Sequence, residues 1–365
     1  MAETARAVLV TLGDPDQLTG GYLYHRRLAA LAPAHGLHLA FASVPERPFP
    51  LPALAARRLV RRVLRQRPRA VIVDSIAAAY LAPALRELGA VPLVGSLHQP
   101  PGGLDHGPLR TALQARLDLL VYRRAALLLV ASELLAEQLV ACGIARRRLR
   151  VIPPGRDVAP LPDGPLPDLR QGRAAAFLCV GNWIPRKGIL PLLDAFARLP
   201  PATGTLHLVG KDDVDPAYAA RVRARLAQAD LRGRVVVHGP VSAARVAQLY
   251  AAADVFVLPS TQEPFGTVYG EAMAMGLPVV GVAAGNLPHL ATDGVEGRIA
   301  PVGNTAALAR ALRELADDPA LRARLGAAAR QRASHRWTWE ETAAHFVQAV
   351  RAVAERYPHG GTASC

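Results

Sequence analysis

The stretch DVFVLPSTQEPFGTVYGEAMAMGLPVV, residues 254–280, contains a strand, a polar loop and a helix in direct succession. Its first apolar run ends at Pro259, the loop STQE follows, and a Pro-Phe-Gly turn leads into a helix that begins near Thr267. Another apolar run follows the helix at 278–282. Continuous apolar strands that alternate with helices are typical of a parallel sheet covered on both faces.

The same alternation extends in both directions along the chain. Before a Pro- and Gly-rich linker at 151–172, strands are expected at 7–12, 37–42, 70–73, 91–97, 126–131 and 150–152. After it, strands are expected at 174–180, 205–210, 234–238, 254–258 and 278–282. The pattern predicts two doubly wound α/β domains, 1–165 and 173–335, and a last helix at 336–357. Ligands of such sheets bind at the carboxyl ends of the strands, and the cleft between two domains is the expected place.

Composition narrows the class of protein. The chain has 365 residues, of which 51% are hydrophobic and 20% charged, as expected for a globular protein. Aromatic residues are only 5%, which argues against a binder that stacks on single-stranded nucleic acid. No membrane span or signal peptide is expected, and the three cysteines match no metal or disulfide pattern. We therefore expect a cytoplasmic location.

The net charge of +14 raises the question of an anionic partner. All but two of the 43 basic residues are arginine, which indicates a compositional bias, and no nucleic-acid-binding motif is present. On a helix over 53–70, one arc of about 140° would carry Arg57, Arg58, Arg61, Arg62 and Arg65. This face could bind an anionic membrane surface, with the protein peripheral on the inner face of the membrane. The alternative is an ordinary surface helix whose aliphatic face packs on the domain core.

Two carboxylates stand out in the opening stretch. Glu263 lies in the loop before the helix and Glu271 in its second turn, with seven residues between them. The helix start, with Gly266 before it, offers unpaired N–H groups to a phosphate or a sugar hydroxyl. The two acids could accept hydrogen bonds from pairs of hydroxyls or act as a general acid and base. The structural alternative is that one of the two acids caps the helix and the other is a solvent-exposed helix residue with no part in binding.

Cations and glycines follow other strands. Arg186 and Lys187 come after the strand of FLCVGNWIPRKGILPLLDA (177–195), where adjacent cations suit a diphosphate. Gly20 and Gly21 open the first helix, where backbone amides could approach an anion. His98 follows a strand of the first domain and could donate to a substrate oxygen or act as a base. Each of these residues also has a purely structural alternative.

In this combination and order, the segments resemble the retaining nucleotide-sugar glycosyltransferases of family 4. That family has the GT-B fold, with two Rossmann-like domains facing each other across a cleft. Glu263 and Glu271 match its Glu-x7-Glu pair. The resemblance is carried by EPFGTVYGEAMAMGLPVV (263–280), VGNWIPRKGILPLLDAFARL (180–199), LYAAADVFVLPS (249–260) and ASELLAEQLVACGIARRRLRVIPPGRD (131–157).

The resemblance implies a role for each matched residue. Glu263 would bind hydroxyls of the donor sugar, Glu271 the nucleotide ribose, and Lys187 with Arg186 the diphosphate. His98 would lie near the anomeric carbon, so that His98, Lys187 and Glu263 form the expected catalytic set. Further donor contacts are implied for Gly20, Gly21, Phe265, Gly266, Thr267 and the loop after His238 and Gly239, which would line the base.

The resemblance also implies a reaction. A hexose would move from a nucleoside-diphosphate donor, UDP- or GDP-linked, to a hydroxyl of a lipid carrier, a glycan or a small natural product. Front-face displacement would retain the anomeric configuration, and cations would take the place of a metal ion. Two positions depart from the family pattern: Asn182 replaces a common Arg, and Asp74-Ser75 stands where a His is frequent. The alternative function is a catalytically degenerate protein that only binds nucleotide sugars.

Overall fold

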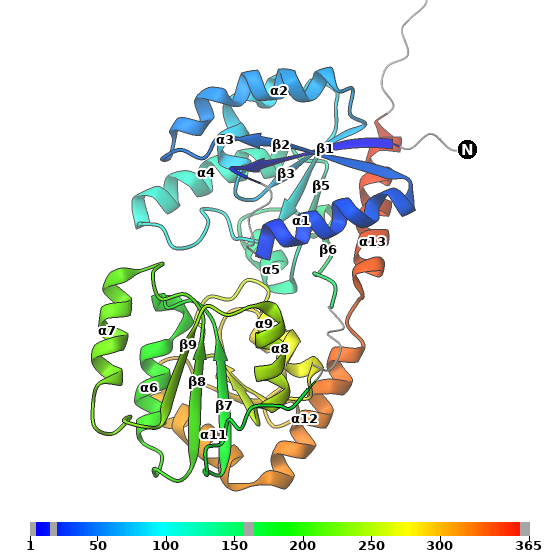
Figure 1. The fold of residues 1–365 in the computed structure, drawn as a ribbon. Coiled ribbons are helices and arrows are strands. Elements are labelled where there is room, and N and C mark those ends of the chain that lie inside the picture. The colour runs from blue at the N-terminus through cyan, green and yellow to red at the C-terminus, as the bar shows by residue number, and fades with distance from the viewer. Residues whose placement is uncertain (1–4, 15–19, 157–163, 358–365) are drawn as a thin grey trace, which may run out of the picture. The chain divides into compact units, whose positions relative to one another are not determined.

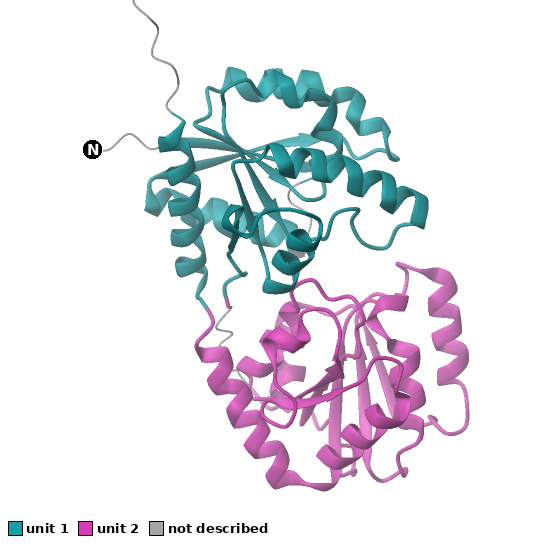
Figure 2. Ribbon diagram, turned by 180° about the vertical axis from the view of Figure 1, so that it is seen from behind, with its two compact units in different colours: residues 1–155, 337–365 teal, residues 156–336 magenta. Residues whose placement is uncertain are grey.

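The computed structural model describes residues 5–14, 20–156 and 164–357, which form two compact units (Figures 1 and 2). Unit 1 comprises the chain up to Gly155 and again from Trp337 onward, and unit 2 comprises Arg156 to Arg336. The chain thus leaves the first unit once and returns to it with the last helix.

Unit 1 is built on a parallel six-stranded sheet in the order β2-β1-β3-β4-β5-β6. Its central strands are buried along their whole length, which explains their nearly unbroken apolar sequence. The strands are β1 (Ala5–Leu12), β2 (Leu37–Val44), β3 (Ala70–Asp74), β4 (Leu93–Leu97), β5 (Leu127–Val130) and β6 (Leu149–Val151).

Helices cover both faces of this sheet. Val8 and Val10 of β1 point into one core, and Ala7 and Leu9 point into the core on the other face. The first face carries α2 (Ala56–Arg65), α3 (Ala78–Leu81), α4 (Pro108–Arg124) and α5 (Glu133–Ala141). The second carries α1 (Gly20–Leu31) and α13 (Trp339–Arg356) (Figure 1). Short 3₁₀ turns are η1 (Ala32–His35), η2 (Leu51–Ala55), η3 (Ala82–Leu88) and η4 (Arg146–Arg148).

Unit 2 repeats this architecture with a second parallel sheet, in the order β12-β11-β10-β7-β8-β9. Its strands are β7 (Ala175–Val180), β8 (Gly204–Val209), β9 (Val235–Gly239), β10 (Val255–Val257), β11 (Val279–Val282) and β12 (Gly297–Ala300). The longer helices are α6 (Ile189–Ala197), α7 (Pro216–Leu226), α8 (Ala243–Ala252), α9 (Thr267–Ala274), α11 (Thr305–Asp317) and α12 (Pro319–Ser334). Two short elements, η5 (Pro185–Lys187) and α10 (Leu287–Leu290), complete the unit. The predicted fold class, two doubly wound parallel-sheet domains, is confirmed.

The boundary between the units differs from the predicted one, which ended the first domain at 165 and began the second at 173. Leu169 is buried in the core of unit 2, and its carbonyl accepts a hydrogen bond from His207 Nε2 (2.8 Å). Arg170 binds Asp254 through two guanidinium nitrogens. The described part of the Pro-rich segment, from 164 onward, therefore packs on unit 2 as part of it.

Local element assignments also differ in places. The segment after β3 forms only the short helix α3 followed by the 3₁₀ turn η3, because Pro83 removes a backbone donor near the junction. β12 was not predicted, since its four residues include Gly297 and Arg298 and show no continuous apolar run. None of the helices in the described ranges is long and apolar enough to cross a membrane.

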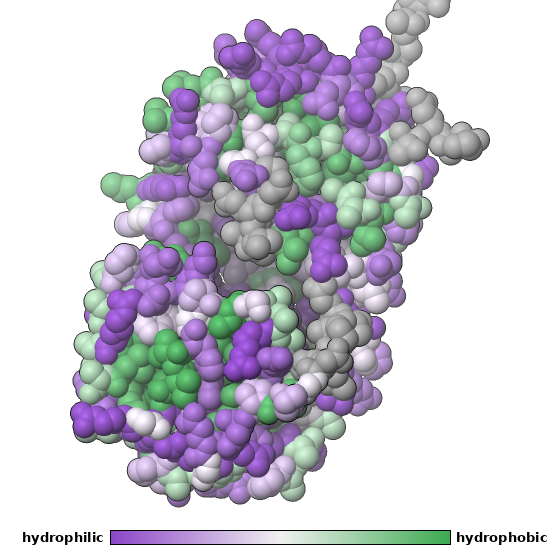
Figure 3. Space-filling model, viewed as in Figure 1, coloured by the Kyte–Doolittle hydropathy of each residue, from purple (hydrophilic) through white to green (hydrophobic). Residues whose placement is uncertain are grey.

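The arginine-rich helix α2 lies on the surface of unit 1. Its aliphatic side chains are buried in the core, namely Ala56, Leu59, Val60 and Val63. This is the arrangement expected of an ordinary surface helix whose aliphatic face packs on the domain core. The arginine side chains form the hydrophilic surface over α2 in Figure 3. Because the apolar arc is already packed against the sheet, it is not available for insertion into a lipid bilayer.

The last helix is tied to unit 1 at the point where the chain re-enters it. Thr338 caps α13 in a capping box with Glu341, and the Thr342 hydroxyl donates to the carbonyl of Pro153 (3.1 Å). Gly155 passes so close to the start of α13 that an added Cβ would lie 2.5 Å from the Cα of Trp339. Only glycine fits this crossing without a backbone shift.

We predict that Gly155→Ala destabilises unit 1 by about 1–3 kcal/mol, because the new methyl group must displace the backbone of α13. Thermal denaturation should show a fall in Tm of about 2–4 °C per kcal/mol for a domain of this size. Gly107→Ala is the matched control: its φ of −66° suits alanine, and no described atom lies within 4 Å of the new Cβ. Equal Tm values for the two variants would contradict the packing argument.

Candidate active site

Two loops at the carboxyl edge of the unit 2 sheet are bound to each other. The first follows β7 and carries Arg186 and Lys187, and the second follows β10 and carries Glu263. The carbonyl of Arg186 accepts from the backbone N–H of Thr261 (2.8 Å) and from the hydroxyl of Ser260 (3.0 Å). In return, Arg186 Nη1 donates to the carbonyl of Gln262 (3.0 Å). Lys187 and Glu263, which are 76 positions apart in the sequence, therefore become neighbours.

This junction brings Lys187 and Glu263 into a direct ion pair. Lys187 Nζ lies 2.5 Å from Glu263 Oε2, and the two side chains are only 12% and 13% exposed. A charged pair that is largely removed from water interacts more strongly than a surface pair. Both side chains are therefore held at the sheet edge by the backbone and by each other.

Glycines make the close approach of the two loops possible. Gly188 has a φ of +71°, and an added Cβ would lie 2.4 Å from the carbonyl oxygen of Pro259 in the neighbouring loop. Gly266 has a φ of +86° and stands directly before α9, where a Cβ would lie 2.7 Å from a methyl group of Leu290. Both positions require the left-handed conformation that glycine adopts without strain.

Glu271 lies one turn into α9 and has different partners from Glu263. The Tyr250 hydroxyl donates to Glu271 Oε2 (3.1 Å), and burial, with the charge of Glu271, raises the pKa of Tyr250 well above its usual value. Arg336 also interacts electrostatically with the Glu271 carboxylate. Its guanidinium lies 5.0 Å from the ring centre of Phe265. Burial lowers the pKa of Arg336, and the charge of Glu271 opposes this shift. Tyr250 and Arg336 were not identified from the sequence, where no local motif marks them.

Three further residues that the sequence singled out in unit 2 are Phe265, Thr267 and Asn182. Phe265 is buried and its carbonyl accepts from Asn286 Nδ2 (2.8 Å), while Thr267 is the exposed first residue of α9. Asn182, where the family often has Arg, uses its side-chain oxygen to accept the backbone N–H of Lys211 (3.1 Å). Asn182 therefore connects the loop after β7 to the loop after β8.

His238 is engaged with another histidine of the sheet. Its Nε2 lies 3.0 Å from Nδ1 of His207, and the two rings stack at 5.2 Å. Since His207 Nε2 donates to the carbonyl of Leu169, His207 Nδ1 accepts and His238 Nε2 must be the donor. Burial lowers the pKa of both rings. Gly239 ends the strand with a φ of +67°.

The predicted residues of unit 1 gather at the carboxyl edge of its own sheet. Gly20 and Gly21 open α1, and the residues 15–19 before them lie outside the described ranges. An added Cβ at Gly21 would lie 3.1 Å from Cδ2 of His98, which follows β4. The structure thus brings Gly21 and His98 together in unit 1, and Arg186, Lys187 and Glu263 together in unit 2.

His98 is part of a buried polar cluster that the sequence did not reveal. Ligating atoms of His25, Asp74 and His98 lie within 4.8 Å of one another, a spacing that could hold a metal ion. The Asp74 carboxylate, however, already accepts from the Thr11 hydroxyl (3.0 Å) and the Ser75 hydroxyl (3.1 Å). The sequence marked Asp74 only as an acid at the end of an apolar strand and as a departure from the family pattern, and neither feature indicates the contact with His25 and His98.

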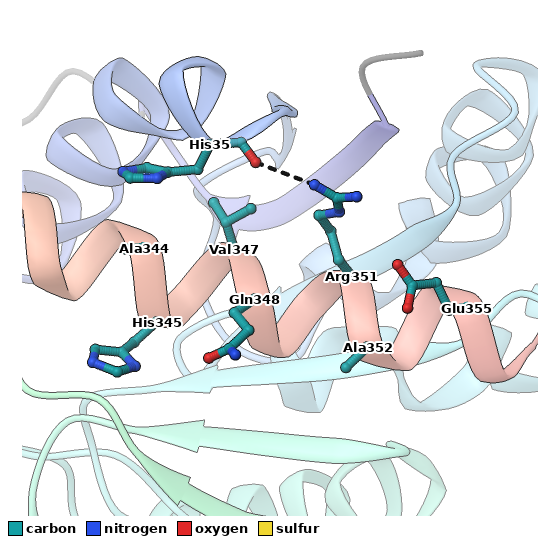
Figure 4. A pocket seen from close by; sticks show the side chains of 8 residues that line it. All are labelled: His35, Ala344, His345, Val347, Gln348, Arg351, Ala352 and Glu355. Carbon is teal, nitrogen blue, oxygen red and sulfur yellow. Dashed lines mark hydrogen bonds between the residues drawn. The ribbon is translucent and has the colours of Figure 1, made fainter. Parts of the chain in front are cut away.

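The pocket in Figure 4 lies elsewhere on unit 1. It runs along α13 and reaches His35, whose carbonyl accepts from Arg351 Nη1 (3.5 Å). His35 lies two residues before the start of β2, so this pocket is at the amino edge of the sheet. Ligands of doubly wound sheets bind at the opposite edge, where Gly21 and His98 lie.

Each of the two units matches a known protein-family model. Residues 6–159 match the family model described as Glycosyltransferase Family 4, and residues 169–332 match the model described as Glycosyl transferases group 1. The two models together span nearly all of the described chain.

Two curated relatives illustrate the sequence similarity. A D-inositol 3-phosphate glycosyltransferase of Xylanimonas cellulosilytica is 35% identical over 236 residues, which is 61% of this chain and 56% of the relative. A phosphatidyl-myo-inositol mannosyltransferase of Mycolicibacterium smegmatis is 35% identical over 211 residues, 56% of this chain and 52% of the relative. The chain thus spans about half the length of the curated relatives it matches.

Solved structures show the same fold at lower identity. Anabaena Alr3699/HepE in complex with UDP and glucose has a TM-score of 0.77 at 23% identity, covering 94% of this chain and 99% of that one. Sucrose-phosphate synthase from Thermosynechococcus elongatus has a TM-score of 0.80 at 23% identity, covering 96% and 100%. Because a family model matches each unit and both solved structures share the fold, the chain belongs to the group 1 glycosyltransferases of family 4, which have the GT-B fold.

Proposed function

We propose that the chain is a retaining glycosyltransferase that moves a hexose from a nucleoside-diphosphate sugar to a hydroxyl acceptor, without a catalytic metal ion. The observation that carries the proposal is the Lys187–Glu263 pair at the carboxyl edge of the unit 2 sheet. It supplies one cation for a diphosphate and one carboxylate for sugar hydroxyls, at the edge where such sheets bind nucleotides.

The pair has a defined part in the reaction. As the bond between the anomeric carbon and the phosphate oxygen breaks, its electron pair goes to the diphosphate, where Lys187 and Arg186 stabilise the growing negative charge. The acceptor oxygen bonds to the same face of the anomeric carbon and gives its proton to the leaving phosphate oxygen. Glu263 holds the sugar by accepting hydrogen bonds from its hydroxyls, and in the absence of donor it neutralises Lys187.

Substrate classes are suggested by the relatives. A solved neighbour was crystallised with UDP and glucose, which supports a UDP-linked donor, with a GDP-linked donor as the alternative. The curated relatives are named for inositol phosphate and phosphatidyl-myo-inositol, which supports a polyol phosphate as acceptor. Unit 1, with its many arginines, has the charge to attract such an anion.

The test is a thermal-shift panel of UDP, GDP, ADP and dTDP sugars in the presence of EDTA, followed by a turnover assay with inositol phosphates. A donor at 100 times its Kd adds about 2.7 kcal/mol, which corresponds to a Tm increase of about 5 °C or more. We expect one nucleotide to give this shift and its sugar to be transferred without metal. Binding with no turnover on any acceptor would favour the degenerate alternative, and activity abolished by EDTA would contradict metal independence.

We predict that Lys187→Ala lowers kcat at least about tenfold, because the leaving diphosphate loses its nearest cation. The control is Lys211→Ala, which removes the other lysine of the chain, an exposed residue of the same unit, and should leave kcat within about twofold. Steady-state kinetics with the donor found above provides the measurement. Wild-type turnover in Lys187→Ala would remove the diphosphate role of this residue.

We also propose that unit 1 binds anionic membrane surfaces through the arginine face of α2, as a peripheral contact without insertion. Arg57 and Arg61 lie 3.3 and 3.4 Å from the Glu87 carboxylate, so part of their charge is compensated. The face still carries a clear excess of positive charge, and each arginine near anionic lipid contributes about 1 kcal/mol. Leu54, 85% exposed in the preceding 3₁₀ turn, adds an apolar contact beside it.

Flotation with anionic vesicles tests this contact. We expect the wild-type protein to float with the vesicles at low salt and to be released at high salt, because the attraction is screened within about 10 Å at 0.1 M salt. A variant with glutamine at Arg58, Arg62 and Arg65 should stay at the bottom. Equal flotation of both proteins, or none at low salt, would show that the face is structural only.

A further inference from the structure

Asp74 is a buried carboxylate at the carboxyl end of β3, beside Ser96 of β4. Its side chain is 1% exposed. Oδ2 accepts from the Thr11 hydroxyl, and Oδ1 accepts from the Ser75 hydroxyl and from the backbone N–H of Ile76 (3.3 Å). A buried charge is tolerated only when such donors surround it, so the site is built to hold an anion.

Two imidazoles face this carboxylate from different elements. His25 of α1 places Nδ1 3.4 Å from Oδ2, and His98 after β4 places Nε2 3.3 Å from Oδ1. Burial lowers the pKa of His25 to about 3, against the attraction of Asp74, so this ring is neutral near pH 7. Burial would raise the pKa of Asp74, but the neighbouring imidazoles and the backbone N–H of Ile76 outweigh burial and lower that pKa to about 2, so the carboxyl group is ionised near pH 7. The carboxylate is therefore an acceptor only, and a ring nitrogen that faces it is favoured in the protonated form.

The ring of His98 is confined on several sides. The backbone N–H of His98 donates to Ser75 Oγ (3.3 Å), which anchors the residue to the loop that also bonds Asp74. Tyr24 and His25 contact the ring edge-on at 5.3 and 4.6 Å, and Gly21 leaves room for its Cδ2 edge. The His98 side chain is 14% exposed, whereas Nε2 is buried. The nitrogen that faces Asp74 is thus the inner one.

We propose that Asp74 is a positioning residue that keeps the proton of neutral His98 on Nε2. A neutral imidazole has one N–H and one lone pair, so a proton on Nε2 leaves the lone pair on Nδ1. Nδ1 then accepts a hydrogen bond from a substrate hydroxyl at the carboxyl edge of the unit 1 sheet. This use of Nδ1 rests on the proposed transferase function, while the tautomer itself does not.

The rival arrangement is a metal ion bound by His25, Asp74 and His98. A metal would need the lone pair of Nε2 and would place the proton on Nδ1, the opposite tautomer. The two arrangements therefore differ in a property that can be measured without any activity.

The first experiment is a long-range ¹H–¹⁵N spectrum of the full chain labelled with ¹⁵N-histidine, recorded at a pH where His98 is neutral. The His98 signals are assigned by their loss in His98→Gln. We expect the pattern of a protonated Nε2 and a bare Nδ1 in the wild type. A protonated Nδ1, or stoichiometric zinc in the purified protein by elemental analysis, would overturn the proposal whether or not Asp74 variants fold.

The second experiment is a kinetic cycle of Asp74→Asn, His98→Gln and the double variant. An amide at 74 has an N–H₂ group that can face Nε2 and favour the other tautomer. We expect Asp74→Asn to lower kcat at least tenfold with the donor KM within threefold. The double variant should be no more than threefold slower than His98→Gln, because both changes remove the same function.

The matched control is Thr11→Val, which removes a hydrogen bond to the other oxygen of the same carboxylate and should leave kcat within threefold. Additive losses in the double variant, or an equal loss in Thr11→Val, would overturn the positioning role and indicate a structural one. If the wild type transfers no sugar, the proposed function fails, and the tautomer measurement still decides the role of Asp74.

Discussion

Every described strand pairing in the two sheets is parallel, and this constraint governs where chemistry can occur in the molecule. In a parallel sheet each strand must be followed by a crossover, so all loops that leave the carboxyl ends emerge along one edge. Polar and charged side chains far apart in the chain then meet there without disturbing the apolar strands. Gly21 with His98 in unit 1, and Lys187 with Glu263 in unit 2, are products of this single rule.

Charge at these edges is held by backbone geometry more than by the ion pairs themselves. The carbonyl of Arg186 accepts hydrogen bonds from Ser260 and Thr261 in the loop of Glu263, and Gly188 lies in contact with Pro259. Side chains positioned this way lose little further freedom when a ligand arrives, which is the basis of preorganised electrostatic stabilisation. Asp74 is held in the same way in unit 1, where the hydroxyl of Ser75 and the backbone N–H of Ile76 bind Oδ1, the oxygen that faces His98.

Much of the site could be predicted because its residues lie in short contiguous motifs. The spacing of Glu263 and Glu271 and the adjacent Arg186 and Lys187 are visible in the sequence, and their loops occur at strand ends as expected. Tyr250, Arg336 and His25 could not be found in this way. Tyr250 and Arg336 lie near Glu271, and His25 lies near Asp74, only because the elements that carry them pack together in the folded chain. A single sequence contains no pattern that indicates such contacts.

The sequence by itself determined the strand and helix alternation, and with it the two parallel sheets and the edge at which each group of candidate residues lies. It did so because burial on both faces demands unbroken apolar strands, and glycine or proline must mark the turns. Only the tertiary structure decided the pairing of side chains at those edges. It assigned Leu169 to unit 2, turned the aliphatic face of α2 onto the core, and joined Asp74 to His98. These outcomes depend on which surfaces meet when the chain closes on itself, and hydrophobic periodicity specifies that a face is buried without specifying its partner.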